Sequence, residues 1–193
     1  MDYPELIAEV TERSGDSTVA TRASMYLRMA EAAIDKALRI GDSESIEVLT
    51  TDASGEATLP SDFSMIRMVQ IGVREAEAID FPTATLTPFV LPRPIYGYAI
   101  RGNKIVTTTP NTDVTLYYYA KIQPLDLTGT NWLIESDPEI YLYAMLKQVF
   151  MARLDAEKAA AAEAMFNSLA AEKRSADAIV RFGRKPFRAA GAL

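Results

Sequence analysis

The sequence contains no cysteine and no histidine among its 193 residues. The absence of cysteine excludes disulfide bonds, thiolate nucleophiles and cysteine-ligated zinc, and the absence of histidine removes the commonest metal ligand. Most familiar catalytic triads are excluded as well, because histidine is the side chain that titrates closest to neutral pH. An enzyme would have to use carboxylates, lysine, tyrosine or serine alone, with Mg²⁺ or Ca²⁺ held by oxygen ligands. We expect no enzyme activity, no catalytic residue, no metal site and no cofactor.

Long apolar runs and phosphate-binding glycine loops are also missing. No stretch reaches the roughly 18 consecutive apolar residues that a membrane-spanning helix needs, so we expect no membrane partner. The acidic start of the chain, with Asp2 and Glu5, lacks the basic region of a signal peptide. The sequence has no G-x-G-x-x-G motif, no Walker-type lysine and no S-x-x-K motif, which argues against a nucleotide-binding or acyl-transfer enzyme.

What the sequence does contain is an ordinary globular composition with an acidic balance. It is 49% hydrophobic and 24% charged, with a formal net charge of -6. These values are typical of a folded chain and not of a disordered one. The last thirteen residues, 181–193, depart from this balance because they hold four basic residues and no acidic one. An acidic body therefore carries a basic end.

Apolar residues recur at helical spacing near both ends of the chain. The clearest repeat covers residues 19–38 and stops at Gly41. A second apolar helix begins near Pro138, and an alanine-rich helix follows it to about Val180. We expect the alanine-rich helix to pack against residues 19–38, because small side chains let helices approach closely.

Between these helical segments the apolar period changes to two. Valine, isoleucine, threonine and tyrosine are enriched from residue 46 to residue 122, and turn residues recur at short intervals. The turns at residues 52–55 and 101–103 predict two hairpins. Residues 114–120 predict a final strand with aromatic rings on both faces. Together these features indicate a small antiparallel sheet.

The sequence therefore predicts an α+β fold with three parts. Residues 1–43 and 125–180 are expected to form a helical bundle. Residues 44–124 are expected to form an inserted small antiparallel β-domain. Residues 181–193 are expected to form an extended C-terminal tail that docks on a partner.

Two segments are candidates for contact with other molecules. A third strand is predicted at residues 65–73. A proline-rich stretch of about twenty residues separates it from the second hairpin, and loops of that length usually contact something. Tyrosines at strand positions, which are Tyr96, Tyr98, Tyr117, Tyr118 and Tyr119, could stack sugars or bases, but such rings more often pack in a core or an interface. We assign subunit or neck-interface contacts to Phe89, Pro92, Arg93, Tyr96 and Tyr98.

The basic end of the chain has two interpretations that stay open on sequence alone. It is either an end that merely aids solubility or a segment that orders on a partner through its rings and its basic side chains. Nucleic acid is a weaker target for it, because the acidic body repels a polyanion and four basic residues release few counterions.

Several stretches resemble one family, the head-to-tail adaptor or head-completion proteins of tailed bacteriophages. The matching pieces are residues 59–63 leading into Ile66 and Val69, residues 96–110, the run of tyrosines at 117–120 and, most specifically, residues 131–143, continuing into the alanine-rich helix. The resemblance extends from the long early helix to about Arg174. The order and spacing of these pieces carry it, and the proline-rich segment 76–94 departs from the usual pattern.

The resemblance implies a structural role in the virion neck. Such proteins form a homo-oligomeric ring beneath the portal protein, usually of twelve copies, which extends the DNA channel and receives the tail or the next neck protein. Their C-terminal segment commonly docks on the portal. By position this implies portal-binding roles for Arg181, Phe182, Arg184, Lys185, Pro186, Phe187, Arg188 and Leu193.

Three hypotheses accompany this interpretation. Acidic residues facing the lumen of a ring would give a wall that does not grip passing DNA, which would cross without specific binding. A peptidoglycan-cleaving virion enzyme using paired carboxylates is the alternative function, although we find no constrained acidic pair. A nucleic-acid-binding module is the third class, and it would show salt-sensitive DNA binding.

Overall fold

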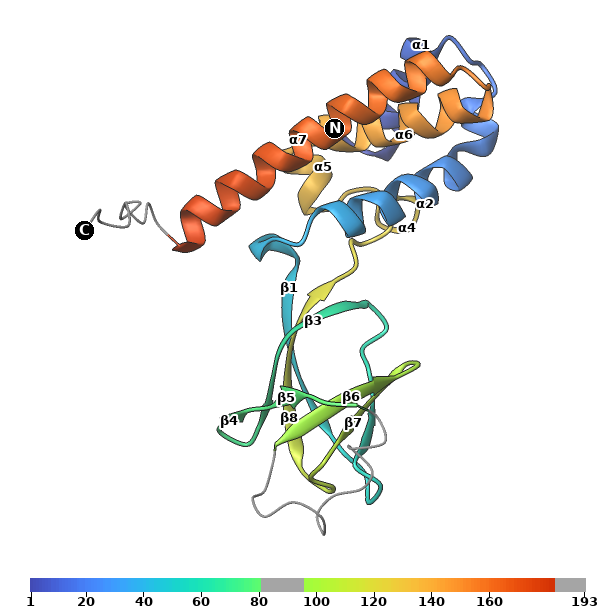
Figure 1. Cartoon of the computed structure of the whole chain (residues 1–193). Helices are drawn as coiled ribbons and strands as arrows, with labels where there is room; N and C mark the ends of the chain where they lie inside the picture. Colours follow the sequence, from blue (N-terminus) through green and yellow to red (C-terminus); the bar gives the residue numbers. More distant parts are fainter. Residues whose placement is uncertain (81–95, 183–193) are drawn as a thin grey trace, which may run out of the picture. The chain divides into compact units, whose positions relative to one another are not determined.

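The computed structural model describes residues 1–80 and 96–182 (Figure 1). These residues divide into two compact units. The helical unit consists of Met1–Ser43 and the described residues from Ile122 onward, and the β unit consists of the described residues of Glu44–Lys121. The α+β prediction is confirmed, because N-terminal and C-terminal helices pack together and strands form from the chain between them.

The helical unit begins with two helices, α1 (Tyr3–Ser14) and α2 (Val19–Ala37). Asp2 caps α1 in a capping box, since its side chain accepts the backbone N–H of Glu5 while the Glu5 carboxylate accepts that of Asp2. Gly15 ends α1 with a left-handed backbone, at φ 65°. A short 3-10 turn, η1 (Gly41–Ser43), follows α2.

Residues 122–182, the described C-terminal part of the chain, add four helices to the helical unit. Asn131 caps the second of them by accepting two backbone N–H groups with its side-chain oxygen. A left-handed Leu154, at φ 60°, separates the last two. The helices are α4 (Leu125–Thr128), α5 (Trp132–Ser136), α6 (Pro138–Ala152) and α7 (Ala156–Phe182).

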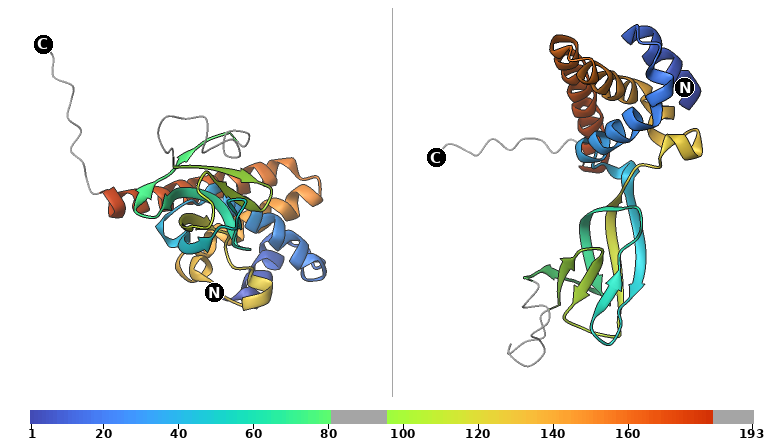
Figure 2. Two further views of the ribbon diagram at one scale, coloured as in Figure 1. Left: turned by 90° about the horizontal axis from the view of Figure 1, so that it is seen from below. Right: turned by 90° about the vertical axis from the view of Figure 1, so that its right-hand side faces the viewer.

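Helix α6 is the centre of the helical unit. It is apolar on nearly every side, as the sequence predicts, and it contacts α1, α2, α5 and α7. The expectation that the alanine-rich helix packs mainly on residues 19–38 is wrong, because α7 runs along α6 instead, as both views of Figure 2 show. Because α6 is apolar on nearly every side, α2 and α7 can pack on different faces of it. The side of α7 that is buried carries Ala159, Ala162, Phe166 and Ala170.

The β unit contains two four-stranded sheets, where the sequence predicts a single antiparallel one. The first sheet has the order β1-β8-β3-β4 and the second has the order β2-β7-β6-β5, in which β5 and β6 are parallel. The strands are β1 (Glu44–Thr50), β2 (Glu56–Thr58), β3 (Phe63–Ile71), β4 (Arg74–Glu75), β5 (Glu77–Ala78), β6 (Gly97–Arg101), β7 (Lys104–Thr107) and β8 (Asp113–Ala120).

One of the two predicted hairpins is confirmed and the other is wrong. β6 and β7 pair across the turn at residues 101–103. The turn at residues 52–55 forms, since the Asp52 carboxylate accepts the N–H groups of Ser54 and Glu56, but β1 pairs with β8 while β2 pairs with β7. Gly55 directs the chain to the second sheet, because its carbonyl accepts the Thr107 N–H at 2.8 Å and a Cβ there would lie 2.5 Å from the Thr107 oxygen.

The core of the β unit lies on one side of β8. Val114, Leu116 and Tyr118 of β8 are buried with Val69 and Ile71 of β3. Tyr117 and Tyr119 point to the opposite side and are half-buried. The prediction of rings on both faces of this strand is therefore confirmed.

Of the helices in the described parts of the chain, none is both long and apolar enough to cross a membrane.

Candidate functional site

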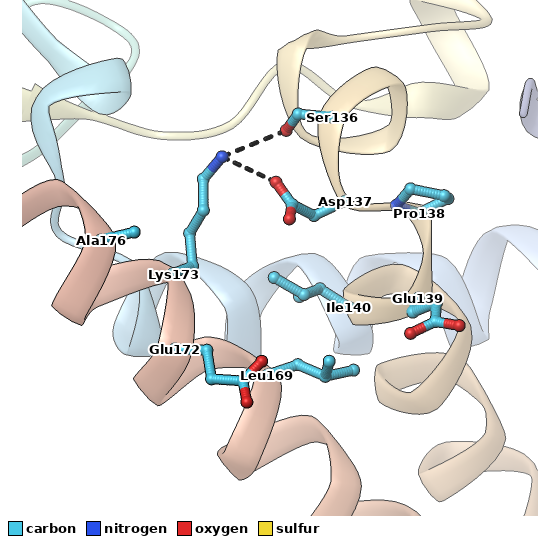
Figure 3. Close-up of a pocket in the computed structure, with 9 residues that line it drawn as sticks. All are labelled: Ser136, Asp137, Pro138, Glu139, Ile140, Leu169, Glu172, Lys173 and Ala176. Carbon is cyan, nitrogen blue, oxygen red and sulfur yellow. Dashed lines mark hydrogen bonds and ion pairs between the residues drawn. The ribbon is translucent and has the colours of Figure 1, made fainter.

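The last turns of α7 are fastened to the rest of the helical unit through Lys173. Its ammonium donates to Asp137 Oδ2 at 2.7 Å and to Ser136 Oγ at 3.3 Å, at the corner between α5 and α6 (Figure 3). It also lies 3.6 Å from Asp42 Oδ2 in η1 and 5.8 Å from the centre of the Trp132 ring. One side chain therefore joins α7 to three other elements.

The contact with Lys173 changes the acidity of Asp137. Burial by itself would raise the pKa of the Asp137 carboxyl, but hydrogen bonds from Lys173 and Ser136 and the charge of Lys173 outweigh it, so the pKa lies below its ordinary value. The carboxylate is thus held in its charged form at neutral pH. Its stabilising contribution is present above the ordinary pKa of an aspartate and is lost as the pH falls through the lowered value.

One helical turn further on, Asp177 and Arg181 make a second fastening. Asp177 Oδ1 accepts the Gly41 N–H at 2.9 Å, and Asp177 Oδ2 lies 3.4 Å from the Arg181 guanidinium. Arg174 donates to the Ala37 carbonyl at the end of α2, at 2.8 Å. The chain after α7 therefore starts from a point that is fixed to α2 and η1.

The structure extends the last helix slightly beyond its predicted end. Arg181 and Phe182 belong to α7, and the Arg181 side chain is only 18% exposed. Arg184, Lys185, Pro186, Phe187, Arg188 and Leu193 lie outside the described residues. Arg181, which the sequence analysis assigned to the tail, thus belongs to the group of contacts that holds the end of α7 to α2 and η1.

A shallow groove of about 580 Å³ lies beside the contact between Lys173 and Asp137. Its floor is apolar, with Pro138, Ile140 and Leu169, while Glu139 and Glu172 stand at its rim (Figure 3). An apolar floor with an acidic rim suits contact with a protein segment that carries both apolar and basic side chains.

A buried polar cluster that the sequence analysis missed holds the chain where it re-enters the helical unit. Glu31 and Asp35 lie one turn apart on α2, and their carboxylates accept the backbone N–H groups of Leu125 at 2.9 Å and Ile122 at 2.8 Å. Glu31 is 7% exposed. Burial is the main cause that raises its pKa, to about 7, with Asp126 and Asp35 adding to it while the hydrogen bond opposes it.

Asn131 and Tyr141 complete the polar cluster. The Asn131 amide donates to the Gln123 carbonyl and to the Tyr141 hydroxyl, both at 2.8 Å. Burial raises the pKa of Tyr141 well above its usual range, so the phenol stays neutral. Two carboxylates on one helix face were visible in the sequence, but no local pattern shows that a distant segment will bury them.

The predicted interface tyrosines are placed in the β unit, and both are half-buried. The Arg74 guanidinium stacks on the Tyr96 ring, 5.2 Å from its centre, and both rings pack against the core of the unit. Burial raises the pKa of Tyr98. Phe89, Pro92 and Arg93 lie outside the described residues.

The acidic side chains do not gather into a site of the kind that carboxylate chemistry needs. Residues 1–80 and 96–182 contain no group of three or more acidic side chains that could hold a metal ion. Asp42 is near Lys173, and Glu44 is paired with Arg67 at 2.6 Å. Nothing in this arrangement indicates catalysis.

Comparison with known families is decisive for the chain as a whole. The family model described as SU10 adaptor protein matches residues 1–186. The chain belongs to this family. The SU10 adaptor proteins are a phage head-to-tail adaptor family, which confirms the resemblance found in the sequence and gives the protein a structural role as an adaptor. A search of curated proteins finds no match.

Proposed function

We propose that this SU10 adaptor acts in the virion neck as a homo-oligomeric ring beneath the portal protein, with twelve copies as the expected number. The ring extends the DNA channel and receives the tail or the next neck protein. The observation that carries this proposal is the match to an adaptor family over residues 1–186, nearly the whole chain. The acidic composition supports a channel wall that lets DNA pass without specific binding.

We further propose that the C-terminal segment is the portal-binding element. The fastening of α7 supports this, because a docking segment transmits force only if its origin is fixed. Lys173, Arg174 and Asp177 tie that origin to the α5–α6 corner, to α2 and to η1. The segment beyond residue 182 adds three basic side chains and no acidic one, so it presents charge opposite to that of the acidic body.

The remaining interface residues keep their proposed role as contacts to a neighbouring subunit or neck protein. Tyr96 and Tyr98 support it because each is half-exposed although it also packs on the core of the β unit. Rings of this kind provide a large contact area at low cost in conformational entropy. Phe89, Pro92 and Arg93 are proposed as contacts from their place in the sequence.

The portal-binding proposal is tested by removing residues 183–193, which leaves α7 and the Arg181–Asp177 ion pair intact. We expect the shortened protein to keep the circular dichroism and melting temperature of the full chain but to bind portal-bearing heads at least tenfold less. Replacing Arg184, Lys185 and Arg188 with alanine should reproduce most of this loss.

A matched control separates loss of charge at the end from loss of charge in general. Lys158 is 64% exposed near the start of α7, and we expect Lys158→Ala to bind normally. Normal joining of heads by the protein that lacks residues 183–193 would contradict the proposal.

A further inference from the structure

The first sheet of the β unit has a second, outward face that is rich in apolar side chains. Neighbouring positions across β1, β8 and β3 form rows on this face, in which Ile46 pairs with Tyr117 and Tyr117 with Met68. Ile46 is 64% exposed and Val48 is 60% exposed. We call this surface the outer face and define it by Ile46, Val48, Met65, Met68, Tyr117 and Tyr119.

The polar groups around the outer face are bonded to one another. Arg67 lies 2.6 Å from Glu44 at one end of the face, and Thr50 donates to Asp113 at 2.8 Å at the other. The Tyr117 hydroxyl donates to Gln70 at 3.3 Å. Because these charged groups already have partners, the face presents mainly apolar area and little free charge to a binding partner.

The outer face ends at an open sheet edge. In the described parts of the chain β1 pairs with β8 on one side and is the last strand of its sheet. Its seven residues contain neither proline nor lysine, the residues that most often blunt such an edge, although Glu44 and Glu47 place two acidic side chains on it. A partner that covers Ile46 and Val48 can therefore also use the backbone of β1.

We infer that the outer face and the β1 edge form a contact between neighbouring copies of this chain, which rests on the ring proposed above. The choice of a second copy comes from that ring, and charge favours this face as the place where copies meet. Each copy carries -6, so copies repel one another through most of their surface, and an apolar face with paired charges lets them approach. DNA gains nothing here, since Arg67 is already paired with Glu44.

The absence of cysteine allows a direct test of this contact. A single Ile46→Cys substitution gives one thiol, which is labelled with benzophenone-maleimide. The labelled protein is assembled onto portal-bearing heads and illuminated. We expect an adduct at twice the chain mass of 21.2 kDa. Peptide mass spectrometry then identifies the residue of the second copy that was captured.

The control carries the same label at Val73, which is 96% exposed between β3 and β4. We expect a yield of chain-to-chain adduct at least fivefold higher from position 46 than from position 73. Equal yields, an adduct to the portal or another neck protein, a crosslink within one chain, or no adduct at position 46 would each overturn the inference. The adaptor role would survive any of these results.

A second variant tests the contact without a label. Ile46→Glu combined with Val48→Glu should lower ring assembly on heads at least tenfold while the circular dichroism spectrum stays unchanged. Full assembly of this variant would overturn the inference. Failure of the unaltered protein to join portal-bearing heads would be a different result, because it would overturn the proposed function and the inference with it.

Discussion

The two units of this protein use their apolar residues differently. In the helical unit the large side chains of α6 are covered by α1, α2, α5 and α7, and charged side chains such as Lys173 fasten the helix ends. In the β unit the core takes one side of β8, while the other side leaves Ile46 and Val48 exposed. The helical unit thus covers its central helix, although Leu127, Leu154 and Val180 are exposed on its surface. In the β unit, exposed apolar side chains lie together on one side of the first sheet.

The largest loss of stability should come from a substitution that leaves a cavity in the helical core. Leu27 on α2 is fully buried, and Leu127 on α4 is 82% exposed. We expect Leu27→Ala to lower the free energy of unfolding by about 3 kcal/mol, because it leaves a cavity beside α6. Leu127→Ala, the matched control, should change it by less than about 0.5 kcal/mol. Urea unfolding followed by circular dichroism at 222 nm measures both, and equal effects would contradict the covered core.

A smaller effect should come from Glu31, whose carboxyl pKa is raised from 4.5 to about 7. Between these values the folded chain keeps a proton that the unfolded chain has lost, so stability falls as the pH rises from about 4.5 to 7 and is level above that. We expect Glu31→Gln to remove this slope and to be more stable at pH 8 by about 2 kcal/mol.

The measurement for Glu31 is urea unfolding at several pH values between 5 and 8. Glu12→Gln serves as the control, because Glu12 is exposed on α1, and its pH profile should follow that of the unaltered protein. A Glu31→Gln profile that kept the original slope would show that this carboxyl does not titrate as its burial requires.

The smallest effect should come from the outer face. Replacing Ile46 and Val48 with threonine keeps the β-branched shape that suits a strand and removes apolar area that is already exposed. We expect the free energy of unfolding to change by less than about 0.5 kcal/mol for each substitution. Thermal unfolding measures this. A loss as large as that of Leu27→Ala would mean that these side chains belong to the fold and not to a contact surface.

Much of the local structure could be predicted because its causes are local. The repeat in residues 19–38 and the proline at position 138 specify helices through short-range spacing and backbone geometry. The turn at residues 101–103 likewise predicts the β6–β7 hairpin. The match to residues 1–186 confirms the family resemblance, which came from the order of several motifs and not from one residue type.

The sequence by itself therefore determined the long helices α2, α6 and α7, one hairpin and the family, while the tertiary structure decided which distant segments meet. The turn after β1 forms as predicted, but β1 pairs with β8, more than sixty residues away in the chain. Glu31 is an ordinary helix carboxylate until the backbone of Leu125 reaches it. Turns and caps depend on neighbouring residues. Strand pairing and burial depend on contacts between residues far apart in the sequence, so their free energy cannot be judged from a short segment.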